Sequence, residues 1–311
     1  MMTVTYKELP SIPVLMDEYK NAVKDIVPGV GTKRVAKDNP TTAFEVKGVK
    51  VDPNHLAEYA SATGFRLTNE LPLTYPYVLS FPIVMKLLTA KDSPLNAVGM
   101  VHLSNTIEQT RPLTVDDVLD FRVHAENLRP HTKGVLLDVV TVASVDGIDV
   151  WTQTSAFLSK GAKLSSSSPF KNLEPTNGRI VDPISFDADT DDAFSRVRVT
   201  ADDIKVYAEA SGDKNPIHIS GVGAKAFGFP ATIAHGMWTA ARLVSSLEGL
   251  VPPAARFKIE FAKPVTLPGT VAIVAQPAGD KAYPVPSQWN LQARKSSKLD
   301  TLHASASIEK L

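Results

Sequence analysis

The chain contains two diverged copies of one segment, and this repeat constrains its fold more than any other feature. Two offsets, of 148 and 152 residues, bring matching residues into register, and a four-residue difference in loop length separates them. The first offset aligns Val51 with Val199, Tyr59 with Tyr207 and Gly64 with Gly212, and the second aligns Met85 with Met237 and Ile107 with Ile259. Because the matches keep their order, we predict two copies of one fold of about 110–120 residues.

A length of 311 residues fits two domains. The segment between the copies contains four consecutive serines, Ser165–Ser168, and the turn-prone pair Asn177-Gly178, which is typical of a linker. A weak helical pattern over Met16–Ile26 predicts a helix before the first copy. The predicted organisation is an N-terminal extension (1–42), a first copy (43–160), a linker (161–186) and a second copy (187–311).

Each copy has the same order of predicted elements, a short helix and a longer helix followed by strands. In the second copy, Met237, Ala240, Ala241, Val244 and Leu247 recur at helical spacing. The predicted short helices are Pro53–Ala62 and Ala201–Ala210, and the predicted strands are Gly99–Gln109, Val118–Asn127, Lys133–Val145, Ile148–Leu158, Arg256–Phe261, Val271–Gln276, Trp289–Arg294 and Thr301–Glu309. A helix followed by an antiparallel meander predicts an α+β fold in which the sheet wraps the helix.

The segment Ser211–His218 places a carboxylate, Asp213, and an imidazole, His218, five residues apart around Asn215-Pro216. The residue before proline is disfavoured in helices, so both side chains can leave a loop toward one point. A carboxylate and an imidazole that share one water can act as a general base. A second segment, Ala234–Trp238, opens a predicted helix, whose first amides are unpaired donors that favour developing negative charge.

Three segments in the second copy carry a resemblance to a known family. YAEASGDKNPIH (Tyr207–His218), FGFPATIAHGMW (Phe227–Trp238) and FAKPVTLPGT (Phe261–Thr270) are similar, in the same order, to motifs of the MaoC-like (R)-specific enoyl-thioester hydratases and dehydratases. With its diverged first copy, the whole chain resembles the longer double-hotdog members, which include actinobacterial 3-hydroxyacyl-thioester dehydratases. The resemblance implies two tandem hotdog folds that join as a pseudo-dimer within one chain.

The resemblance also implies a reaction, the reversible hydration of trans-2-enoyl thioesters in fatty-acid metabolism. Asp213 and His218 match the catalytic pair of the family, and the Gly236 amide matches its oxyanion donor. Which of Asp213 and His218 takes the proton from water stays open. Asn215 is expected to hold the loop or the water, or to be purely structural, and His235 either to donate toward the thioester or to pack. The implied substrate is an acyl thioester of coenzyme A or acyl carrier protein, with no metal or redox cofactor.

Four basic residues lie near these motifs and are candidates for binding the carrier phosphates: Arg242, Arg256, Lys258 and Lys263. The alternative for each of them is ordinary solvated surface charge. The remaining histidines are scattered without the spacing of metal ligands: His55, His102, His124, His131 and His303.

The first copy lacks the proposed chemistry. Phe65 and Glu70 stand where the second copy has Asp213 and His218, and Ile83-Val84 stand in place of His235-Gly236. One active site per chain follows. The first copy then either provides an apolar surface for the acyl chain or only stabilises the fold. Two prolines in 71–77 predict that its long helix is shortened or displaced, which would open a groove for medium or long acyl chains.

Composition excludes several other classes. The 33 basic and 33 acidic residues balance, which gives no electrostatic case for binding nucleic acid or an acidic membrane. With no cysteine, disulfides and thiolate catalysis are excluded. No signal peptide or membrane span is recognisable, so we expect a soluble cytoplasmic monomer that acts as a pseudo-dimer, with further homodimerisation open. The competing functions are a hotdog acyl thioesterase and a non-catalytic acyl-thioester-binding subunit.

Overall fold

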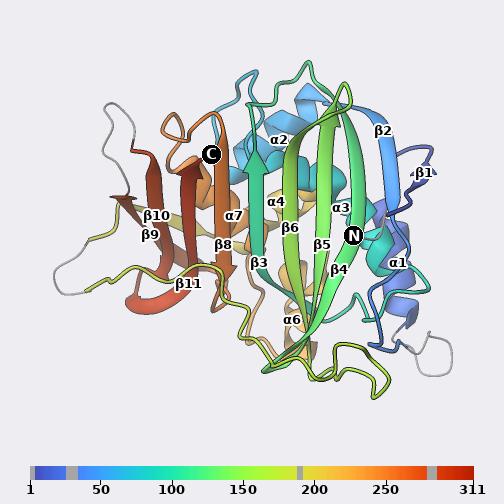
Figure 1. The fold of residues 1–311 in the computed structure, drawn as a ribbon. Helices are drawn as coiled ribbons and strands as arrows, with labels where there is room; N and C mark the ends of the chain where they lie inside the picture. Colours follow the sequence, from blue (N-terminus) through green and yellow to red (C-terminus); the bar gives the residue numbers. More distant parts are fainter. Residues whose placement is uncertain (1–3, 26–33, 188–191, 279–285) are drawn as a thin grey trace. The chain divides into compact units, whose positions relative to one another are not determined.

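The computed structural model describes residues 4–25, 34–187, 192–278 and 286–311. Its described helices are α1 (Leu15–Asp25), α2 (Pro53–Thr63), α3 (Tyr75–Leu88), α4 (Ala201–Ser211), α5 (Pro216–Ile219), α6 (Gly221–Ala226) and α7 (Gly236–Ser245) (Figure 1). Its strands are β1 (Lys7–Leu9), β2 (Phe44–Lys50), β3 (Met100–Gln109), β4 (Val118–His131), β5 (Gly134–Val145), β6 (Ile148–Lys160), β7 (Ser195–Val199), β8 (Ala255–Phe261), β9 (Gly269–Ala278), β10 (Gln288–Lys295) and β11 (Lys298–Lys310).

The chain divides into two compact units that interleave in sequence. The first unit comprises residues 1–50, 76–105 and 116–179, and the second comprises 51–75, 106–115 and 180–311. Helix α2 and the loop that follows it therefore group with the second unit, although they belong to the first copy of the repeat. The predicted domain limits are limits of the sequence copies and stay a prediction.

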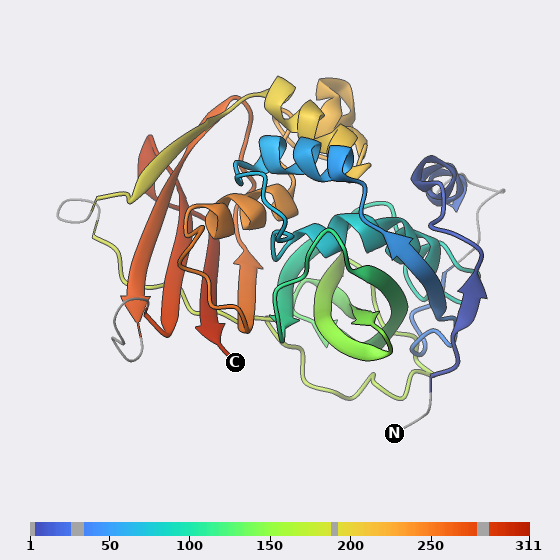
Figure 2. The same cartoon turned by 90° about the horizontal axis from the view of Figure 1, so that it is seen from above.

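In the first unit, a strongly curved sheet encloses α3, and its strands follow the order β1-β2-β4-β5-β6-β3 (Figure 2). The pairings of β2 with β4, β4 with β5 and β5 with β6 are antiparallel. Leu119, Phe121 and Val123 alternate along β4 and have no exposed surface, which agrees with the predicted strand over Val118–Asn127. The sheet and α3 share one apolar core, as predicted for an α+β unit.

Helix α3 corrects one prediction, because it has 14 residues and is longer than its counterpart α7, which has 10. The prolines of 71–77 do not shorten it. Pro72 precedes the helix, and Pro76 is its second residue, where a missing amide hydrogen removes no helical hydrogen bond. A groove opened by a shortened helix therefore has no support in this fold.

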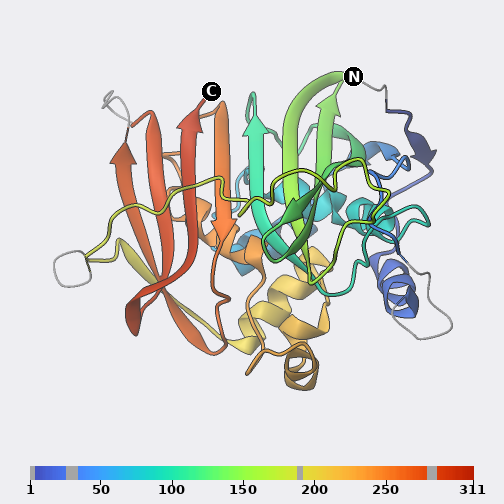
Figure 3. The ribbon, with the colours of Figure 1, turned by 60° about the horizontal axis from the view of Figure 1, so that its bottom comes forward.

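In the second unit, five antiparallel strands follow the order β8-β11-β10-β9-β7 (Figure 3). Helix α7 lies against this sheet and buries Met237, Ala240, Ala241 and Val244, four of the five residues that defined the predicted helix. The fifth, Leu247, is also buried but lies two residues beyond the end of α7. Helix α2 packs beside α4 and also contacts α7 (Figure 2). The α+β fold with an antiparallel sheet around a central helix is confirmed in each unit.

The short helices α2 and α4 show that the repeat is structural. Their N-caps, Asp52 and Thr200, are 148 residues apart, and so are their C-caps, Gly64 and Gly212. Both glycines have left-handed backbones, with φ of 74° and 69°, a conformation that glycine adopts without strain. No helix in the described part of the chain is long and apolar enough to cross a membrane.

Candidate active site

The loop after α4 holds Asp213. A capping box begins α4, with Thr200 and Asp203 each accepting from the other's backbone amide. After α4, which Gly212 caps, the Ser211 hydroxyl oxygen accepts from the Asp213 amide at 3.2 Å. The Asp213 carboxylate in turn accepts from the Asn215 amide at 3.2 Å. These local bonds fix the turn that the sequence predicted and leave the Asp213 side chain partly exposed.

Asn215 and Pro216 place His218 on the short helix α5. Asn215 has an extended ψ of 127°, and its side-chain oxygen accepts from the Ile217 amide at 3.3 Å as the helix N-cap. Pro216 then occupies the first helical position, where proline is favoured. Asn215 thus caps α5 in this structure, and its expected role toward the loop or the water stays a prediction.

The tautomer of His218 follows from its hydrogen bond. Its Nδ1 lies 2.8 Å from the Ile233 carbonyl oxygen. A carbonyl only accepts, so Nδ1 carries the hydrogen and Nε2 carries the lone pair. His218 is 8% exposed, and a buried imidazole with an unprotonated nitrogen can accept a proton.

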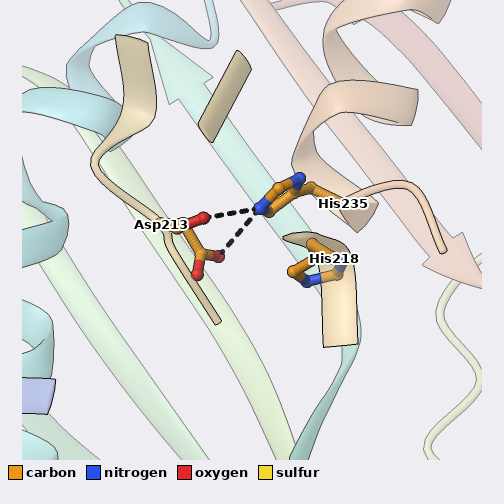
Figure 4. A group of neighbouring side chains, drawn as sticks. All are labelled: Asp213, His218 and His235. Atoms are coloured by element: carbon orange, nitrogen blue, oxygen red, sulfur yellow. Dashed lines mark hydrogen bonds and ion pairs between the residues drawn. The ribbon is translucent and has the colours of Figure 1, made fainter. Parts of the chain in front are cut away.

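His235 joins Asp213 and His218 into one cluster (Figure 4). Its Nε2–H donates to the Asp213 backbone carbonyl at 2.8 Å, and its Nε2 lies 3.8 Å from the Asp213 carboxylate. Its ring stacks on the His218 ring, with centroids 3.6 Å apart and an interplanar angle of 27°. Its Nδ1 is buried and has no hydrogen-bond partner within the described residues. His235 therefore packs against both predicted catalytic residues at once.

Burial keeps both imidazoles neutral. It lowers the pKa of His235 to about 3, with the neighbouring His218 acting in the same direction and Asp213 opposing. Burial also lowers the pKa of His218, against the opposing effects of Asp213 and the hydrogen bond to Ile233. At neutral pH both imidazole rings of the cluster are therefore neutral.

One ligand atom each from Asp213, His218 and His235 lies within 4.8 Å of the others, a separation that a metal ion could span. The stacking argues against such a site. Ring lone pairs lie in the ring plane, so two stacked rings do not aim at one point, and the Nε2 lone pair of His235 is replaced by a hydrogen. The donor set fits acid/base chemistry better than metal binding.

Gly236 is the first residue of α7, directly after His235. A Cβ there would lie 3.2 Å from the ring of Phe261, closer than side chains normally pack. Within the described residues, no protein acceptor receives the Gly236 amide hydrogen. This amide is therefore available to a ligand at a helix N-terminus.

The four candidate phosphate-binding residues have different surroundings. The Arg242 guanidinium is half-buried and donates to the Thr63 carbonyl at 2.9 Å, filling the space beside Gly64. Arg256 pairs with Glu108 and Glu309, and Lys258 lies 3.6 Å from Glu309. Lys263 is exposed, and among the described residues its ammonium group has no ionic partner. Three of these cations are thus already engaged with other protein groups.

Two aromatic residues of the sequence motifs belong to the core. Tyr207 is 1% exposed and lies beside its repeat partner Tyr59, with ring centroids 6.2 Å apart. Trp238 is 3% exposed and donates from its indole nitrogen to the Ala62 carbonyl at 3.0 Å. Sequence reasoning missed the polar partners of this region, His55 and Thr63, because no local pattern distinguishes them from other residues of α2.

Comparison with known proteins identifies relatives of this chain. Residues 188–289 match the family model described as a MaoC like domain. The 3-hydroxyacyl-thioester dehydratase X of Mycobacterium tuberculosis is 39% identical over 260 residues, which cover 83% of this chain and 86% of the relative. A crystal structure of HtdX from the same organism is similar with a TM-score of 0.72 and 37% identity, covering 86% of this chain and 100% of that one.

More distant structures share the fold. A MaoC-like dehydratase from Phytophthora capsici matches with a TM-score of 0.68 at 16% identity, over 91% of this chain and 98% of that one. The sequence motifs, the hotdog architecture of both units and the extent of identity to the mycobacterial relative all agree. The chain therefore belongs to the MaoC-like dehydratase family.

Proposed function

We propose that the chain catalyses the reversible hydration of trans-2-enoyl thioesters to (3R)-hydroxyacyl thioesters. The observation that carries this proposal is the neutral His218, whose Nε2 lone pair lies in one cluster with the Asp213 carboxylate. Membership of a dehydratase family makes the chain a hydro-lyase, and the substrate is an acyl thioester.

In the hydration direction, a water oxygen forms a bond to C3 while one of its O–H bonds breaks. Asp213 and His218 both offer acceptors, so together they can hold both hydrogens of one water and receive the proton. The same proton, or one exchanged with solvent, then forms the new C2–H bond. Dehydration follows the same steps in reverse.

As C3 gains its oxygen, negative charge develops on the thioester oxygen. We assign the Gly236 amide as the donor that stabilises this charge, since a preorganised donor of this kind contributes strongly in a water-excluded site. The supporting roles go to Asn215, which holds the loop, and to His235, which contacts the Asp213 carbonyl and the His218 ring together.

The carrier is proposed to be coenzyme A or acyl carrier protein, with Lys263 the best-placed candidate for a phosphate contact because its charge is not neutralised by an acidic neighbour.

We further propose a monomer in which the two copies act as a pseudo-dimer, working in the cytoplasm. Light scattering after size exclusion measures the molecular mass and distinguishes the monomer from a further homodimer, the alternative that stays open.

The direct test follows the loss of the conjugated double-bond absorbance of crotonyl-CoA and longer trans-2-enoyl-CoAs, with chiral analysis of the product. We expect loss of absorbance and the (3R) product. A chain that leaves every enoyl thioester unchanged, on either carrier, would contradict the proposal. Thiol release from a saturated acyl-CoA would indicate a thioesterase instead, and the absence of cysteine makes this assay free of protein thiols.

A further inference from the structure

Helix α2 carries a histidine that contacts the end of α4, the helix that precedes Asp213. The Nε2 of His55 lies 2.7 Å from the carbonyl oxygen of Ala210. Because that carbonyl can only accept, Nε2 carries the hydrogen and donates. His55 comes from the first copy of the repeat, the copy that has lost the acid/base pair, whereas Ala210 belongs to the second.

The other ring nitrogen of His55 is also engaged. Nδ1 lies 2.8 Å from the hydroxyl oxygen of Tyr75, and with Nε2 protonated it accepts from that hydroxyl. Tyr75 has no exposed surface, and burial raises its pKa, so the hydroxyl stays protonated. Two hydrogen bonds thus hold the imidazole plane in one orientation.

The Ala210 carbonyl lies at the start of the catalytic loop. Carbonyls in the last turn of a helix have no helical partner, and the Lys214 amide that could have reached Ala210 bonds to Gly212 instead. The next residue, Ser211, accepts from the Asp213 amide. His55 therefore anchors the turn from which Asp213 leaves the helix.

The carbonyls at the ends of α2 and α4 accept from different side chains. The residue equivalent to Ala210 in the first copy is Ala62, whose carbonyl accepts from the Trp238 indole on α7. The residue equivalent to His55 in the second copy is Asp203, which belongs to the capping box of α4. The contact from His55 to Ala210 thus has no repeat-related counterpart, although the helices α2 and α4 are themselves related by the repeat.

We propose that His55 is a positioning residue of the active site, which holds the end of α4 and thereby the Asp213 loop. This inference rests on the proposed function, because it assumes that Asp213 takes part in the reaction. Both ring nitrogens of His55 are occupied by protein partners, so His55 does not exchange protons with the substrate. Its loss lowers turnover by loosening the geometry of Asp213, and small misplacements of a reacting group cost rate steeply.

The test compares His55→Ala, His55→Gln and Tyr75→Phe with the wild-type chain in steady-state hydration of an enoyl-CoA. We expect His55→Ala to lower kcat by about tenfold, the value of one well-placed hydrogen bond, with KM little changed. Glutamine keeps a donor that can reach the Ala210 carbonyl, so it should restore most of kcat. Tyr75→Phe removes only the hydrogen bond that orients the His55 ring, so its kcat should lie between those of His55→Ala and His55→Gln.

His124 supplies a matched control, because it also pairs with a tyrosine, Tyr6, at 3.0 Å, but in the first unit. His124→Ala should leave kcat within about twofold of wild type, inside ordinary variation, because its partners Tyr6 and Glu126 do not belong to the loop that holds Asp213. An unchanged kcat in folded His55→Ala would overturn the proposal, as would an equal loss in His55→Ala and His55→Gln. If His55→Ala does not fold, Tyr75→Phe decides, since a reduced kcat supports the proposal and an unchanged kcat overturns it.

Hydrogen exchange of the amides of Asp213, Lys214 and Asn215 gives a readout that needs no turnover. These amides should exchange faster in His55→Ala than in wild type and His55→Gln. If the wild-type chain lacks hydratase activity, the proposed function is wrong. The exchange rates still test whether the hydrogen bond from His55 to Ala210 holds the loop. Unchanged exchange in His55→Ala would overturn the anchoring role even if activity fell.

Discussion

The proposed proton transfers depend on two side chains, Asp213 and His218, whose substitution should affect rate and not folding. Asp213→Asn and His218→Gln should each lower kcat by about a hundredfold or more, the low end for a positioned acid/base group. Phe65→Leu and Glu70→Gln, at the equivalent positions of the first copy, are the controls and should leave kcat unchanged. Near-normal turnover by either catalytic variant, measured on folded protein, would contradict the mechanism.

A second residue-scale prediction concerns stability and pH. The pKa of His235 is about 3 in the folded chain, against an ordinary 6.5. The unfolded chain therefore binds one more proton between these values, and folding loses up to about 1.4 kcal/mol per pH unit as the pH falls below 6.5. In His235→Gln this loss is absent, so urea unfolding should show a shallower decline in stability from about pH 7 to pH 5.

Wild type and His235→Gln above pH 7.5 provide the control. His235 is neutral there in both the folded and the unfolded chain, so the free energies of unfolding of the two proteins should change with pH in parallel. Parallel curves across the acidic range as well would mean that His235 titrates normally, which contradicts its burial as a neutral ring.

Gly236 and Gly221 offer a matched pair at helix starts. A Cβ at Gly236 would press on the Phe261 ring at 3.2 Å, whereas a Cβ at Gly221 meets nothing within 4 Å. Gly236→Ala should move the start of α7 and its amide, lowering kcat by about tenfold or more, as expected when an oxyanion donor is displaced. Gly221→Ala should leave kcat unaffected, and equal behaviour of the two variants in the hydration assay would argue against the assigned donor.

Among the helices, the end of α2 contacts α7 through Gly64 and Arg242. Gly64 ends α2 with φ of 74°, and a Cβ there would overlap the half-buried Arg242 guanidinium on α7, at 1.4 Å from Nη1. Gly48 has a similar φ of 70° but open space around it. Both alanine variants carry the left-handed strain, about 1–2 kcal/mol, and only one also displaces the arginine.

Gly64→Ala should therefore be less stable than Gly48→Ala by at least about 1 kcal/mol, because the displaced guanidinium loses its hydrogen bond to Thr63. Urea unfolding of the two variants measures the difference directly. Equal destabilisation would show that Arg242 moves without cost and that it does not join α2 to α7.

Many elements were predictable because their signals are local. The predicted helix over Ala201–Ala210 is α4, which ends one residue later, and the eight predicted strands are all present. Three strands were not predicted, β1, β2 and β7, which have three to seven residues and lie at or near sheet edges. Such strands take much of their stability from a neighbour, and a neighbour distant in sequence leaves no local signal.

At the scale of the whole molecule, the divergence of the two copies predicts one active site per chain. Asp213→Asn should bind substrate without rapid turnover, so calorimetric titration of this variant with a trans-2-enoyl-CoA measures stoichiometry. We expect one thioester per chain, because Gly236, which lets the backbone approach the thioester, is replaced by Val84 in the first copy. Two equivalent sites per chain would show that the first copy also binds substrate.

The repeat, the α+β architecture, the family motifs and the closeness of Asp213 to His218 were predictable from the chain alone, because they depend on periodicity, caps and turn residues close together in sequence. Three features emerged only in the folded chain: α3 stays long despite its prolines, His235 stacks on His218, and His55 donates to the Ala210 carbonyl. The last two join residues that lie far apart along the chain. A hydrogen bond between residues 155 positions apart forms only where packing brings two helices together, and no local pattern encodes that contact.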